Sequence, residues 1–208
     1  DTKREAAMNC IKTTLRILLT TIAALQLAAC SRTVQWKEEV LLNTGETIWI
    51  SKVVRYTING QPGNPLDMGY LPDHAEVTSF EFDGREYVFN EPVNILVLAI
   101  SNHKTPVFLA EPASKGWYKL VDFPMCATPY YVQFVPDSTG LRWTWLEHIE
   151  PWTYNLHTNL MLDRYSPSRL KDRYTMADKA KQHYWMDRHS VDIQKIDPSK
   201  MNQNCQRH

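Results

Sequence analysis

Residues 77–89 read VTSFEFDGREYVF. Two runs of alternating apolar and polar side chains flank the pair Asp83-Gly84, and Asp-Gly is favoured in the type I′ turns of two-residue β-hairpins. The segment therefore predicts two antiparallel strands, at residues 77–82 and 86–89. It is the clearest local signal in the chain, and it indicates a β fold.

Similar patterns occur on both sides of this hairpin. Residues 34–42 and 47–57 are rich in β-branched and aromatic side chains and flank Gly45, which we expect in a turn with positive φ. The glycine and proline content of residues 59–72 predicts a loop. Further strands are expected at residues 95–100, 107–110, 117–121, 130–135 and 141–146.

Short strands at regular spacing are typical of sandwiches and barrels. We therefore expect a mostly β fold, an antiparallel sandwich or barrel-like domain, over residues 30–160. A C-terminal helix and a polar tail are expected over residues 161–208. Ser166-Pro167 predicts the start of the helix, and apolar residues at helical spacing extend it to about Trp185. Its basic excess fits anionic lipid or a partner, or else a solvated amphipathic face.

The N-terminal part of the chain has the order of an export signal. Residues 1–7 are charged and small, and we interpret them as upstream residues outside the fold. A short basic segment with Lys12 and Arg16 then precedes an apolar run at residues 17–29. This run is too short to span a bilayer, because a transmembrane helix needs about 20 apolar residues.

Leu27-Ala28-Ala29-Cys30 resembles the lipobox of bacterial lipoproteins. The resemblance implies that residues 8–29 are a signal peptide, removed before Cys30, whose sulfur carries lipid. Several acyl chains on one residue are needed for stable anchoring. The next residue is Ser31 rather than aspartate, which by the enterobacterial sorting rule implies the outer membrane, facing the periplasm. The alternatives are an ordinary secretory signal with an incidental Cys30, or a buried apolar helix.

Two cysteines follow Cys30, namely Cys126 and Cys205. In an oxidising periplasm two such thiols favour one disulfide bond, which would tie the polar C-terminal tail to the body. The alternative is a buried free thiol at Cys126 and a solvent-exposed Cys205.

A loose, spaced pattern in the body is similar to one in small uncharacterised lipoproteins of proteobacteria. It consists of Trp36, Val40, Gly45, Ile48, Arg55, Cys126, Pro129-Tyr130, Trp143 and Asn159-Leu160. The resemblance covers much of the chain after Cys30 and implies a lipoprotein, but it implies no activity or site residues.

Aromatic residues are most frequent between residues 117 and 154. Alternation puts Trp143 and Trp145 on the same side of one strand. Together with Trp152, these rings either form part of the core or make an exposed patch that binds a protein or glycan partner.

The sequence contains no familiar catalytic or metal-binding pattern. It lacks Gly-x-Ser-x-Gly, His-Glu-x-x-His, Cys-x-x-Cys and a glycine-rich phosphate loop. Residues 137–140, Asp-Ser-Thr-Gly, predict a turn, and His183 with Asp187 is best explained as a pair on a helix surface. We expect no metal and no cofactor. The 23 basic and 23 acidic residues balance, so there is no basic field for nucleic acid.

These observations together predict a lipid-anchored protein of the bacterial envelope with a noncatalytic binding or structural role. Its expected partners are the membrane, through lipid on Cys30, and a protein of the envelope. One alternative is a periplasmic immunity lipoprotein that neutralises an envelope-directed toxin. The other is an enzyme whose site is assembled from distant strands.

Overall fold

The structure is a computed structural model, and it describes residues 31–60, 68–112, 123–124, 126–146, 148–161, 170–186, 195–201 and 205. At residues 58–60, 68–76 and 182–186 it describes the backbone alone. Several sequence predictions lie wholly or partly outside the described residues. They are the upstream residues 1–7, the signal peptide at residues 8–29, the lipidation site Cys30, the strand at residues 117–121, the helix start at Ser166-Pro167, and the helix-surface pair of His183 with Asp187.

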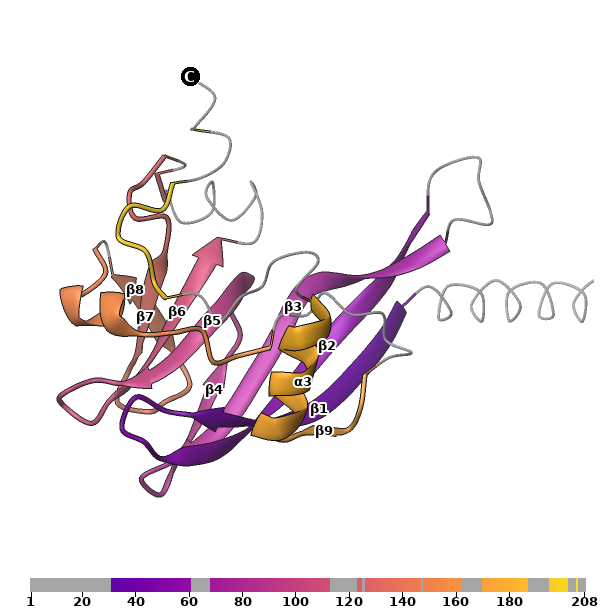
Figure 1. Ribbon diagram of the computed structural model, residues 1–208, viewed down its shortest axis with the longest axis horizontal. Helices are drawn as coiled ribbons and strands as arrows, with labels where there is room; N and C mark the ends of the chain where they lie inside the picture. Colours follow the sequence, from indigo (N-terminus) through magenta and orange to yellow (C-terminus); the bar gives the residue numbers. More distant parts are fainter. Residues whose placement is uncertain are drawn as a thin grey trace, which may run out of the picture.

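Two β-sheets make up the described fold, and aromatic side chains of one sheet pack against those of the other. Figure 1 shows the four-stranded sheet against one end of the longer, five-stranded sheet. One sheet has the order β4-β3-β2-β1-β9 and the other the order β5-β6-β7-β8. The elements are β1 (Ser31–Leu41), β2 (Thr47–Gly60), β3 (Met68–Phe82), β4 (Arg85–Phe89), β5 (Val93–Ile100), β6 (Pro106–Pro112), β7 (Val132–Pro136), β8 (Trp143–Leu146), the 3-10 helix η1 (Pro151–Asn155), β9 (Arg173–Tyr174) and α3 (Met176–Met186). The predicted mostly β sandwich with a C-terminal helix is confirmed.

The two predicted hairpins form with the expected turn chemistry. Gly45, between β1 and β2, has a φ of 85°. Asp83 and Gly84, between β3 and β4, have φ values of 51° and 70°. Positive φ at both central residues is what a type I′ turn requires, and the turn pairs Glu81 with Glu86.

The loop predicted at residues 59–72 is wrong at both of its ends. β2 continues to Gly60, and β3 begins at Met68 and includes Pro72. Proline cannot donate a ladder hydrogen bond, but it is tolerated beside a β-bulge. The β2–β3 register shifts between Val54 and Tyr56, and Tyr56 is the partner of Pro72. The strand therefore accommodates the proline at an irregularity.

The predicted helix is wrong over residues 170–175. Arg173 and Tyr174 form β9, which pairs in parallel with β1. Helix α3 begins at Met176, because Thr175 and Asp178 form a reciprocal capping box. The Asp178 backbone N–H donates to Thr175 Oγ1 at 3.2 Å, and Asp178 Oδ2 accepts from the Thr175 backbone N–H at 3.1 Å.

The sandwich core lies between the four-stranded sheet and one end of the long strands β1 to β3. It is built mainly from aromatic side chains, and Phe89 is its centre: its ring centroid lies 4.6 Å from that of Phe108 and 5.1 Å from that of Phe134. The Trp143 ring contacts those of Phe89 and Phe108. Burial of large apolar and aromatic surfaces is the main stabilising contribution in such a core.

The two sheets are also joined along their edges. At one side, the Val88 backbone N–H donates to the Gly140 carbonyl at 3.1 Å, and Trp143 Nε1 donates to the Val88 carbonyl at 2.8 Å. At the other side, the amides of Asn43 and Asn159 pair with the backbone of β5. At these positions the edge groups of β4 and β5 are paired within the protein, so they are not open for pairing with another chain.

Candidate functional site

A belt of buried charged side chains crosses the inner face of the five-stranded sheet. Glu38 on β1 and Lys52 on β2 are both 0% exposed, and Lys179 from α3 is 4% exposed. On one side of the belt lies the sandwich core, with Val40 and Ile50. On the other lies a second apolar cluster, of Trp36, Val54, Tyr56, Met161 and Tyr174. We call the three charged residues the charged belt.

Glu38 is the acceptor at the centre of the charged belt. Its Oε2 lies 2.9 Å from Lys179 Nζ, and its Oε1 lies 3.6 Å from Lys52 Nζ. The Met161 backbone N–H donates to Oε2 at 3.1 Å. A buried carboxylate requires such partners because the loss of its hydration is costly.

Both lysines use backbone carbonyls in addition to Glu38. Lys52 Nζ donates to the Met161 carbonyl at 2.8 Å. Lys179 Nζ donates to the carbonyls of Glu39, at 2.8 Å, and Asn159, at 2.5 Å. Burial lowers the pKa of Lys179 below its ordinary value, although the charge and hydrogen bond of Glu38 oppose that shift.

The charged belt fastens three parts of the chain that are far apart in sequence. The capping box fixes where α3 begins, and Lys179 then lies in its first turn, above Glu38. The segment at residues 159–161 supplies two carbonyls and one N–H. The contacts of Glu38 and Lys179 are thus made within the protein. This arrangement suits a structural role, in which the two residues hold α3 and residues 159–161 on the sheet.

Next to the charged belt lies a groove of about 420 Å³ between α3, β5 and the end of β1. Its walls are mostly apolar and include Leu42, Leu98 and Met176; its polar lining residues are Asn43, Asn155, His157, Thr158, Asn159 and Lys179. The polar atoms of Asn43, Asn159 and Lys179 are engaged by the protein's own backbone. The rest of the lining is apolar apart from Asn155, His157 and Thr158, and such a mainly apolar surface suits the binding of an apolar group.

The amide of Asn159 takes the place of a neighbouring strand at the edge of β5. Its Oδ1 accepts from the Leu98 N–H at 2.9 Å, and its Nδ2 donates to the Leu98 carbonyl at 2.8 Å. Nδ2 also donates to the Leu41 carbonyl at 2.9 Å, which connects the two sheets. Asn43 pairs in the same way with Ile100. Both residues therefore support the floor of the groove.

A second hollow, of about 480 Å³, lies on the outer face of the five-stranded sheet. Its lining is largely polar, with Lys37, Ser51, Ser79, Glu81 and Glu86 around Trp49. The guanidinium of Arg173 lies 4.3 Å from the centroid of the Trp49 ring, a distance typical of cation–π contacts. Polar residues alternate with apolar ones along these strands, so this face is the solvent-facing side of the sheet.

The three tryptophans that the sequence singled out lie in two places. Trp143 and Trp145 are partly buried against the sandwich core, and Trp145 contacts Phe123 with 6.1 Å between ring centroids. Trp152 packs against a separate cluster on the other face of the four-stranded sheet, and its Nε1 donates to Glu150 Oε2 at 3.1 Å. These contacts favour the packing role, and partner binding by the three rings stays a prediction.

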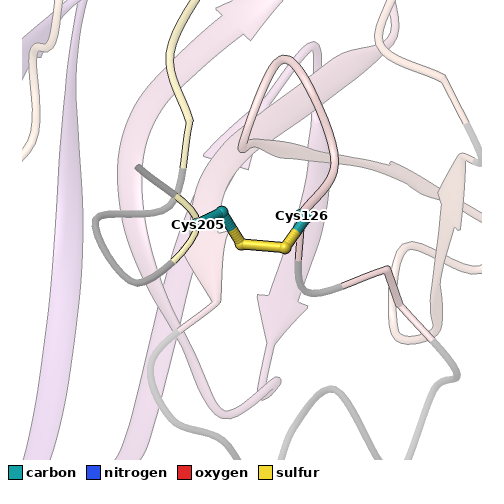
Figure 2. The surroundings of a disulfide bond; sticks show 2 residues. All are labelled: Cys126 and Cys205. Carbon is teal, nitrogen blue, oxygen red and sulfur yellow. A yellow bond between two sulfur atoms is a disulfide. The ribbon is translucent and has the colours of Figure 1, made fainter. Parts of the chain in front are cut away.

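Cys126 and Cys205 form the predicted disulfide bond, which Figure 2 shows in its surroundings. The bond joins residues 79 positions apart, and residues 195–201 lie against the body as well. Ile196 is 1% exposed, and its N–H donates to the Leu156 carbonyl at 2.9 Å. Lys200 pairs with Glu111. Burial lowers the pKa of Lys200, but Glu111 and Tyr131 together outweigh burial, so the pKa is raised.

The remaining sequence interpretations concern turns and metals. Residues 137–140 form the predicted turn, in which Asp137 Oδ1 accepts from the N–H groups of Thr139 and Gly140, each at 3.0 Å. Within the described residues, no three His, Cys, Asp or Glu side chains come close enough to hold a metal ion. In the same part of the chain, no helix has both the length and the apolar character to cross a bilayer.

Sequence reasoning missed the charged belt, although a signal for it was present. Residues 36, 38 and 40 share one face of β1, and residues 48, 50, 52, 54 and 56 alternate likewise along β2. Glu38 and Lys52 are the charged positions in these otherwise apolar rows. A charge at such a position on each of two neighbouring strands predicts a buried pair.

Comparison with known proteins gives no assignment: no family model, no curated protein and no solved structure matches the chain.

Proposed function

We propose that the protein is a lipid-anchored component of the bacterial envelope with a noncatalytic binding or structural role. The observation that carries the proposal is the sequence Leu27-Ala28-Ala29-Cys30. It stands directly before Ser31, the first residue of β1. Acyl chains on Cys30 would thus hold the β-sandwich on the outer membrane, facing the periplasm.

The disulfide bond between Cys126 and Cys205 supports export from the cytoplasm. Disulfides form and persist in oxidising compartments such as the periplasm and are rare where thiol reductants dominate. A lipobox and a disulfide are independent features, and both favour the envelope.

The engagement of the buried charges supports a noncatalytic role. A general acid, base or nucleophile must reach a substrate. Glu38 and Lys179 instead bond to one another and to backbone groups. The groove beside them presents mainly apolar side chains.

The proposal is tested by labelling cells that express the whole chain with radioactive palmitate. We expect incorporation that is lost in Cys30→Ser and kept in Cys10→Ser, the matched control within the signal region. Membrane separation on a sucrose gradient should place the labelled protein in the outer membrane, and Ser31→Asp should move it to the inner membrane. An unlabelled protein, or one recovered free after lysis, would show that the proposal is wrong.

A further inference from the structure

We infer that the far end of the β2–β3 hairpin contacts the lipid surface on which the chain is anchored, an inference that rests on the proposed lipid attachment at Cys30. At this end the structure describes residues 57–60 and 68–71, which we call the hairpin arm. The inference names a second membrane contact, made by protein rather than by acyl chains.

The strand register places the hairpin arm beyond the anchored residue. Ser31, which follows Cys30, has Thr57 as its partner in β2. β1 begins at this level, but the β2–β3 ladder continues for three more pairs, Ile58 with Tyr70, Asn59 with Gly69 and Gly60 with Met68. At about 3.4 Å per residue, the arm extends about 10 Å past Ser31. Figure 1 shows the start of β1 and the far ends of β2 and β3 at the same end of the molecule.

The direction of β1 decides which side of the protein meets the membrane. β1 runs from Ser31 towards the sandwich core, so the folded body lies ahead of the anchored residue. The hairpin arm extends the opposite way, towards the side on which Cys30 would be held. The headgroup layer of one leaflet is about 5 to 8 Å thick, so an extension of about 10 Å is enough to enter it.

The residue types of the hairpin arm suit a lipid interface. Positions 57–60 are Thr, Ile, Asn and Gly, and positions 68–71 are Met, Gly, Tyr and Leu, so none is charged. By alternation and register, positions 58, 60, 68 and 70 share one face of the ladder. Tyrosine is enriched at membrane–water interfaces. Without basic residues, the arm would bind through apolar partition, and its contact would not require anionic lipid.

The test uses the full chain, processed and acylated in bacteria, with Asn59→Cys labelled by an environment-sensitive nitrobenzoxadiazole dye. Cys126 and Cys205 are bonded to each other, and acylation occupies Cys30, so the new thiol is the labelling site. Glu46→Cys, in the turn at the other end of β1, is the matched control. The labelled proteins are reconstituted in phosphatidylethanolamine vesicles, with or without phosphatidylglycerol, that contain nitroxide lipids.

We expect a blue-shifted emission and quenching by the nitroxide lipids for the label at residue 59, in both kinds of vesicle, and neither effect at residue 46. Adding Tyr70→Asp to the Asn59→Cys chain should weaken the quenching, because a carboxylate is unfavourable in the interface. Circular dichroism establishes that each variant is folded.

Intact mass and vesicle flotation test the anchor separately. If the chain is acylated and floats but the label at residue 59 stays in water, the arm inference is wrong and the anchor stands. If no acyl chain is found, the proposed function itself fails. Shielding of residue 59 in native envelopes, but not in protein-free vesicles, would replace the lipid surface with a protein partner and overturn the inference.

Discussion

Lys179 Nζ lies 2.9 Å from Oε2 of Glu38, and this ion pair joins the first turn of α3 to the middle of β1. Both side chains are buried, so water cannot replace either partner. The pair is the centre of the charged belt, and it attaches the helix together with the bonds from Lys179 Nζ to the carbonyls of Glu39 and Asn159.

Removal of that carboxylate should be strongly destabilising. Glu38→Ala leaves Lys52 and Lys179 buried without a counter-charge, and breaking a buried pair in this way costs about 3 to 5 kcal/mol. Urea unfolding measures the loss. Lys181→Met, on the exposed part of the same helix, is the control and should change stability by no more than about 0.5 kcal/mol. Equal effects of the two variants would contradict the structural role of Glu38.

The contribution of the α3 capping box to stability should depend on pH in the acid range. Backbone and side-chain hydrogen bonds from Thr175 and Lys171 lower the pKa of Asp178 to about 2, from an ordinary value of 3.8. Because the folded-state pKa is the lower one, the contribution of Asp178 is complete above about pH 4 and is lost as the pH falls through 2. The stability difference between the wild type and Asp178→Asn should therefore shrink over this interval. A difference that is constant with pH would argue against the capping role.

Asn159→Ala should open the junction between the sheets. The variant leaves the Leu98 N–H and carbonyl, and the Leu41 carbonyl, without their partner, and an unsatisfied buried group costs about 1 to 3 kcal/mol. Amide hydrogen exchange should accelerate at Leu98. Asn155→Ala, in the same groove but exposed, is the control, and the prediction is wrong if it accelerates exchange at Leu98 as much.

Loss of the disulfide should loosen the C-terminal segment first. Cys205→Ser removes a bond that closes a long loop, which typically contributes about 2 to 4 kcal/mol. Residues 195–201 would then be held by the pair of Lys200 with Glu111 and by buried Ile196. Limited proteolysis should cut this segment sooner in Cys205→Ser, and equally soon in Cys126→Ser. If proteolysis is unchanged, the prediction is wrong, because the other contacts then hold residues 195–201 in place without the disulfide bond.

Local turn chemistry explains why the hairpins could be predicted. Gly45 and Asp83-Gly84 fix their turns through positive φ, a property of the residues themselves. The start of α3 is also signalled by local sequence, the capping box in Thr175-Met176-Ala177-Asp178. Ser166-Pro167, however, indicated an earlier helix start. The loop prediction at residues 59–72 relied on glycine and proline content. It was wrong at its ends because an irregularity in the β2–β3 register lets β3 include Pro72.

The charged belt depends on tertiary structure and could not be assembled from periodicity alone. The alternation marks Glu38 and Lys52 as inward positions, yet nothing local indicates that Lys179 completes the set. Its place follows from the short pairing of β9 with β1, which brings the start of α3 over the sheet. The groove beside it likewise exists only once the Asn159 amide meets β5.

The charged belt also has a consequence for how β1 and β2 find their alignment during folding. Alternation distinguishes inside from outside, so a slip by one residue is excluded, but a slip by two leaves every apolar side chain facing inward. A slip by two in the direction that pairs Glu38 with Ile48 would carry Glu38 about 7 Å along the sheet, away from Lys52, and leave both charges among hydrocarbon. Chains misaligned in that direction therefore carry an electrostatic penalty that the correctly paired strands avoid.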